Sequence, residues 1–122
     1  MTSPQSAAKR RGAKFEIDVL KWLRKVGMNA ERVARAGKDD AGDIVCYVAG
    51  RPYVFELKAT ARLDLPAYWR EACEEAENFA KARNLPSAPP AYVIVKRRSK
   101  GIEDAWVITT LEKWVENVGG EA

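Results

Sequence analysis

The stretch DIVCYVAGRPYVFELKA, residues 43–59, decides the fold of this chain of 122 residues. Its two runs, 43–49 and 53–59, are apolar on both faces over most of their length. That pattern is typical of central strands covered on two sides. Gly50-Arg51-Pro52 between the runs has the composition of a hairpin turn. The stretch therefore predicts a β-hairpin at the centre of a sheet.

Further helices and strands are expected on both sides of this hairpin. Apolar periodicity, turn residues and caps predict, in chain order, a helix over 11–26, a strand over 30–35, a loop over 36–42, the hairpin, a helix over 66–84, strands over 91–95 and 105–108, and a last helix after Thr110. The last helix is expected to turn its apolar side chains inward, namely Leu111, Trp114, Val115 and Val118. This order predicts an α/β or α+β domain in which helices flank a mixed sheet.

The length and composition of the chain fit one folded domain. The residues are 47% hydrophobic and 31% charged, which is normal for a globular protein with its own core. We expect one domain over 9–118, a disordered polar tail at 1–8 and a short C-terminal tail at 119–122.

Charge is compatible with a nucleic-acid partner without proving one. The chain has 21 basic and 17 acidic residues, a formal net charge of +4. Basic residues gather at 9–14 and 96–100, and acidic residues gather at 71–77. Two solvated basic surfaces explain these clusters as well as a DNA-binding surface does, so both interpretations stay open.

The absence of histidine excludes several kinds of site. A chain without His has no Ser–His–Asp triad, no histidine general base and no His-based zinc site. Cys46 and Cys73 are too few for structural zinc, and we expect reduced core thiols in a cytoplasmic protein. If a phage encodes the chain, that compartment is the host cytoplasm. No apolar stretch reaches membrane-spanning length, and no signal peptide is recognisable.

The residues best suited to chemistry are Asp43, Glu56 and Lys58. Side chains alternate along a strand, so Glu56 and Lys58 are expected on one face. A structural salt bridge is the plain interpretation of such a pair. Two carboxylates brought together repel each other, however, and a divalent cation relieves the repulsion. Carboxylate oxygens suit Mg²⁺ or Mn²⁺, and Lys58 can then orient the attacking water or stabilise charge on a phosphate.

These residues resemble the PD-(D/E)xK nuclease superfamily, and more closely the archaeal-type and phage Holliday junction resolvases. The likeness covers residues 9–117 and rests on an ordered set of short motifs: Arg11-Gly12, Glu16, Arg32, Arg35, Asp43-Ile44, Glu56-Leu57-Lys58 and Asn78-Phe79-Ala80. The resemblance implies a restriction-endonuclease-like core of order αβββαβ, followed by a further strand and a C-terminal helix. Two positions depart from the family pattern. Gly42 replaces the usual proline, and Ala36-Gly37 stand where a serine is expected.

The resemblance also implies roles for individual residues. Asp43, Glu56 and the main-chain carbonyl of Leu57 would bind the metal, and Lys58 would serve the water or the transition state. Glu16 would complete the site, directly or through water, although a half-exposed peripheral glutamate is the plain alternative. Five basic residues are candidates for DNA phosphate contacts, namely Arg10, Arg11, Arg32, Arg35 and Lys38.

Three functions follow as hypotheses. The first is a homodimeric, Mg²⁺-dependent endonuclease that cuts four-way DNA junctions, in which two sites related by a two-fold axis make paired cuts. The second keeps this chemistry in a repair or restriction-type nuclease acting on linear, flapped or single-stranded DNA. The third is a non-catalytic DNA-binding module whose acidic residues are structural.

Overall fold

The computed structural model describes residues 4–33 and 43–119 of the chain. Its elements are α1 (Pro4–Lys25), β1 (Asn29–Arg32), β2 (Asp43–Val48), β3 (Arg51–Lys58), α2 (Leu65–Ala82), β4 (Ala91–Val95), the 3-10 turn η1 (Ile102–Asp104), β5 (Trp106–Ile108) and α3 (Leu111–Asn117). The predicted order of helices and strands is confirmed.

One mixed sheet of five strands, in the order β1-β2-β3-β4-β5, forms the centre of the molecule. Neighbouring strands are antiparallel except β3 and β4, which are parallel and joined through α2. The central hairpin turns at Ala49 and Gly50, whose φ angles are 52° and 79°. Positive φ at both turn residues matches the twist of a tight hairpin. The turn therefore lies one residue earlier than expected, and Arg51 and Pro52 belong to β3.

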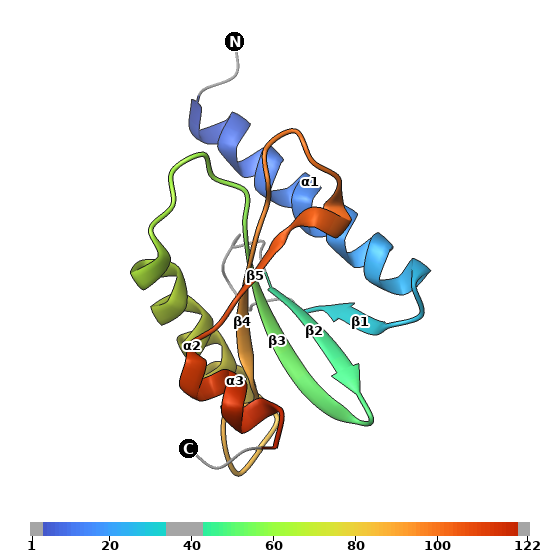
Figure 1. The fold of residues 1–122 in the computed structure, drawn as a ribbon, viewed down its shortest axis with the longest axis vertical. Helices are drawn as coiled ribbons and strands as arrows, with labels where there is room; N and C mark the ends of the chain where they lie inside the picture. The colour runs from blue at the N-terminus through green and yellow to red at the C-terminus, as the bar shows by residue number, and fades with distance from the viewer. Residues whose placement is uncertain (1–3, 34–42, 120–122) are drawn as a thin grey trace.

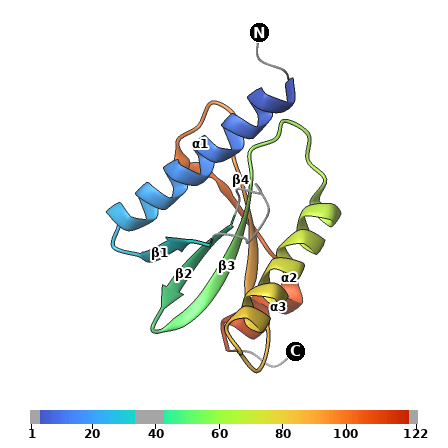
Figure 2. The same cartoon turned by 180° about the vertical axis from the view of Figure 1, so that it is seen from behind.

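Two helices cover the two faces of the sheet, and the strands lie between them in both views (Figures 1 and 2). The core on the α1 side is made of Phe15, Val19, Ala30, Ile44, Cys46, Leu57 and Ile94. The core on the α2 side is made of Val45, Val54, Tyr68, Ala72, Ala76, Phe79, Ala91, Val93 and Val95. Strand alternation explains the division, because neighbours along a strand point to opposite faces. The fold is α+β and consistent with the restriction-endonuclease-like architecture.

The N-terminal helix is longer than the apolar pattern indicates. It begins at Pro4 and not at Arg11, so residues 4–8, which we expected in a disordered tail, are helical. Proline suits the first turn of a helix, because its missing N–H needs no partner there. Strand β1 ends at Arg32. The loop expected at 36–42 lies outside the described residues.

The inward orientation expected for the apolar residues of α3 is wrong for Leu111, Trp114 and Val118, whereas Val115 is partly buried. The side chains of Leu111, Trp114 and Val118 are 78%, 51% and 61% exposed. Helix α3 is instead held by polar contact, because the Asn117 side-chain amide donates to the Tyr92 hydroxyl at 2.8 Å. Periodicity identifies the apolar face of a helix but not what covers it. These three residues, with the exposed Trp106 of β5, are called the C-terminal apolar surface below.

Candidate active site

Strand β3 carries Glu56 and Lys58 on the face that packs against α2. The Lys58 ammonium Nζ lies 3.4 Å from Oε1 of Glu56, and it also pairs with the carboxylate of Glu71 on α2. Its position above the Tyr68 ring, 5.1 Å from the centroid, adds a cation–π contact. Glu56 is only 7% exposed, so a carboxylate is held in a mostly apolar layer beside a cation.

The surroundings of Lys58 keep its ammonium charged. Burial lowers the pKa of Lys58, but Glu71 and Glu56 outweigh burial, so the pKa lies above its ordinary value. A lysine with a raised pKa does not act as a base near neutral pH. Lys58 can therefore donate hydrogen bonds and stabilise negative charge.

The register of the sheet places the backbone of Asp43 beside Glu56. Asp43 and Glu56 are directly paired residues of the antiparallel strands β2 and β3. Paired positions in antiparallel strands have Cβ atoms roughly 5 Å apart. The Asp43 side chain itself lies outside the described part of the structure. Among the side chains that are described, no group of three metal-ligating residues occurs.

Glu16 lies on the other side of the sheet, with α1. Its side chain is 1% exposed and forms an ion pair with Arg32 of β1. Arg32 is paired in the sheet with Ile44, the residue after Asp43. The ion pair thus stands beside the start of β2, and the Arg32 side chain remains half exposed.

The other predicted DNA contacts are only partly within the described chain. Arg10 and Arg11 are exposed on α1. Arg35 and Lys38 lie outside the described residues.

The sequence pattern identified neither Glu71 nor Tyr68 as a partner of Lys58. Glu71 belongs to the acidic residues at 71–77, and its side chain is half exposed while it contacts Lys58. Tyr68 is buried, and its hydroxyl contacts Thr60 at 2.6 Å and donates to the Arg62 carbonyl at 2.8 Å. These contacts join α2 to the end of β3 and to the segment after it, and they depend on how the helix packs against the sheet, which the local sequence pattern does not predict.

A groove of about 490 Å³ includes Lys58 in its lining. It lies between α1 and the end of β3 with the following segment, residues 59–62. Its lining includes four basic residues, namely Lys9, Arg11, Lys58 and Arg62. We call it the basic groove.

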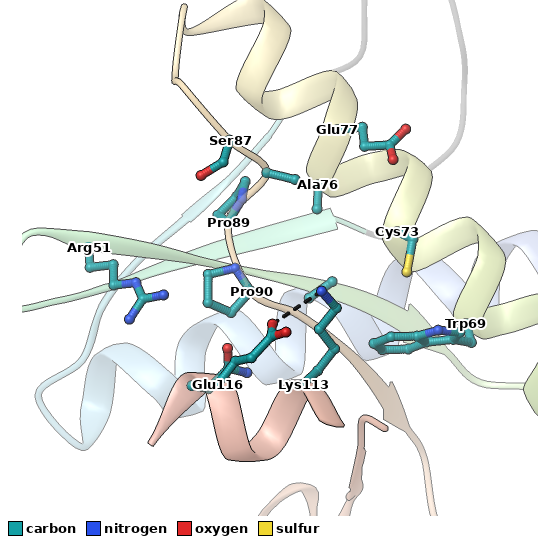
Figure 3. Close-up of a pocket in the computed structure, with 13 residues that line it drawn as sticks. Arg51, Trp69, Cys73, Ala76, Glu77, Ser87, Pro89, Pro90, Lys113 and Glu116 are labelled. Carbon is teal, nitrogen blue, oxygen red and sulfur yellow. Dashed lines mark hydrogen bonds and ion pairs between the residues drawn. The ribbon is translucent and has the colours of Figure 1, made fainter. Parts of the chain in front are cut away.

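A second cavity, of about 480 Å³, lies between α2, α3 and the connection before β4 (Figure 3). Trp69 and Cys73 line one side, and Lys113 pairs with Glu116 across 3.2 Å on the other. Burial raises the pKa of the Cys73 thiol. Cys46 is buried in the α1-side core, and both cysteines are free thiols. This cavity does not include Glu56 or Lys58 in its lining.

Comparison with known proteins assigns a family to most of the chain. The profile of the archaeal Holliday junction resolvase family (Hjc) matches residues 7–117. No curated protein and no solved structure gives a significant match. Within the part of the chain that the structure describes, every helix is too short or too polar to span a membrane.

Proposed function

The chain belongs to the archaeal Holliday junction resolvase family and is a nuclease of that family, and from this we propose that it hydrolyses phosphodiester bonds at four-way DNA junctions with a divalent metal ion. One observation carries the assignment of the site. Glu56 and Lys58 share the α2 face of β3, and the register pairs Asp43 with Glu56. Burying a charged side chain in a central strand costs free energy unless the charge is paired or coordinates a metal ion.

The donor set fits a hard divalent cation. The residues that would hold it are Asp43, Glu56 and the main-chain carbonyl of Leu57, all oxygen donors from neighbouring strands. Oxygen donors without imidazole or thiolate suit Mg²⁺, and Mn²⁺ is expected to substitute. The ion, when bound, lowers the pKa of a water molecule and neutralises charge on the phosphate.

The chain's own residues would supply orientation and charge. Lys58, held by Glu71 and Glu56, would donate a hydrogen bond to the attacking water or to a phosphate oxygen that gains charge in the transition state. Glu16 would complete the site, directly or through water, and Arg32 beside it would contact a phosphate. Arg10 and Arg11 are proposed as further phosphate contacts, and Arg35 and Lys38 remain predictions.

The C-terminal apolar surface supports a homodimer. Its four side chains, Trp106, Leu111, Trp114 and Val118, are each at least 51% exposed. Among the described strands β5 is the last, so its outer edge can pair with a strand of another molecule. Two copies of β5 can pair antiparallel about a two-fold axis, which buries both apolar surfaces. A dimer built in this way carries two active sites, as paired cuts require.

The test is cleavage of a panel of DNA shapes with Mg²⁺, with Mn²⁺ and with EDTA. We expect the four-way junction to be cut faster than linear duplex or flaps, and only with a metal ion. Glu56→Gln should remove cleavage, whereas Glu74→Gln, on the exposed face of α2, should not. Preference for linear duplex would favour a repair or restriction-type nuclease. Junction binding without cutting under either metal would favour the non-catalytic module.

A further inference from the structure

The basic groove lies between α1 and the segment after β3, and Lys58 is among the residues that line it. We infer that it holds the phosphodiester backbone of one DNA strand, which packs against α1 at Gly12. The inference rests on the proposed function, because the groove shares Lys58 with the candidate active site. It adds Gly12, Lys9 and Arg62 to the residues that recognise the substrate.

The charge of the groove fits a polyanion. Lys9 and Arg11 come from α1, Arg62 comes from the segment after β3, and Lys58 is the last residue of β3. Among the described residues that line the groove, none is acidic. Cations from two separate elements can contact successive phosphates of one strand, and such contacts position a duplex without reading its sequence.

Gly12 lies inside α1, where a glycine has no structural advantage. A glycine in a helix interior costs about 1 kcal/mol relative to alanine. A Cβ added at Gly12 would have no heavy atom within 4 Å, so the chain's own packing does not demand glycine. Its φ is not in the left-handed region that favours glycine. The open space at Gly12 belongs to the groove, and a strand can approach the helix backbone there.

The opposite wall of the groove is held in place by hydrogen bonds. The Arg62 carbonyl accepts from the Thr60 hydroxyl and from the Tyr68 hydroxyl, each at 2.8 Å. The Lys58 carbonyl accepts from the Lys96 N–H at 2.9 Å, which fixes the end of β3. Arg62 therefore projects from a segment anchored to the buried Tyr68, and binding requires little reordering of this wall.

The first experiment separates stability from binding at Gly12. Gly12→Ala should raise the thermal midpoint by about 2–5 °C, because alanine is the better helix residue. The same change should weaken binding of a labelled four-way junction by about tenfold, because a methyl group fills space needed by the strand. Gly12→Leu should weaken binding further. Binding is measured by fluorescence anisotropy in EDTA, so that no strand is cut.

Asn78→Ala is the matched control, because Asn78 is exposed on α2 and outside the groove. It should also stabilise the protein but leave junction affinity unchanged. A stabilised Gly12→Ala variant with wild-type affinity would overturn the inference. A lower thermal midpoint for Gly12→Ala would overturn it too, because the space at Gly12 would then not be open.

Arg62→Gln tests the groove without touching the helix. The loop contacts of Arg62 use its main-chain carbonyl, so the fold should be unchanged. The slope of log affinity against log salt should fall by about one. An unchanged slope would show that Arg62 does not contact the DNA backbone, and it would overturn the inference that both sides of the groove bind DNA. If the variants show these binding effects but the wild-type protein cuts no junction, the proposed function fails and the groove stands. If the wild-type protein cuts the junction normally and both variants bind it with unaltered affinity, only the inference about the groove is wrong.

Discussion

Strand β3 and helix α3 break the usual rule of side-chain placement in opposite directions. β3 holds a glutamate and a lysine in the layer between a sheet and a helix, where Glu56 is 7% exposed. α3 holds Leu111, Trp114 and Val118 toward solvent, with exposures of 51% to 78%. Each arrangement costs free energy in an isolated chain. Departures of this kind mark the parts of a fold that serve something other than stability.

The free-energy costs of the two arrangements are offset in different places. The charge of Lys58 is balanced within the chain by Glu56, Glu71 and the ring of Tyr68. The apolar face of α3 has no comparable cover in the described part of the chain, and the homodimer proposed above would provide it. In the functions proposed above, the first region would serve catalysis within one molecule, and the second would serve association between molecules.

The largest expected effect concerns β3. Lys58→Met keeps the length of the side chain and removes its charge, so we expect cleavage to fall by about 10²–10³-fold because transition-state charge loses a donor. Single-turnover cleavage of a junction with Mg²⁺ measures the change. Lys81→Met, at the exposed end of α2, should retain wild-type rates. Near-normal cleavage by Lys58→Met would show that the buried pair is structural.

An effect of intermediate size concerns α3. Replacing Leu111 and Trp114 by serine should weaken the dimer by about 10²-fold or more, because two exposed anchors of the apolar surface are lost. Sedimentation velocity at several concentrations measures the association. The same double variant should keep its circular dichroism spectrum, since neither side chain is in the core of the chain.

Val26 gives the control for this variant. It is 53% exposed just beyond the end of α1 and outside the C-terminal apolar surface, so Val26→Ser should leave association unchanged. If the wild-type chain stays monomeric at micromolar concentration, the apolar face of α3 does not serve association, and the proposed difference between the two regions is wrong.

The smallest expected effect refines the account of β3. Glu71→Gln leaves Glu56 beside Lys58 but removes the carboxylate that reaches it from α2. We expect cleavage to fall by about tenfold, because the ammonium is less well positioned while the chemistry is intact. Glu71→Asp should recover part of the rate, and Glu74→Gln should have no effect. A loss as large as that of Lys58→Met would instead place Glu71 in contact with the substrate.

The hairpin and its flanking helices were predictable from the sequence because they depend on local pattern. Two apolar runs joined by a turn specify adjacent strands, and alternation then places Glu56 and Lys58 on one face. The start of α1 was not predicted, because residues 4–8 are helical but carry no periodic apolar pattern that would indicate a helix. Helix formers extend a helix beyond the part that packs.

By itself, the sequence determined the order of elements, the central hairpin and the strand spacing of Glu56 and Lys58, because these follow from neighbours along the chain. Only the tertiary structure decided that Glu71 and Tyr68 hold Lys58, that Glu16 pairs with Arg32, and that α3 turns its apolar face outward. The physical reason is that these features depend on how the helices pack against the sheet. Which face of a helix meets a sheet depends on the packing of the whole domain, and local periodicity carries no information about the partner that covers it.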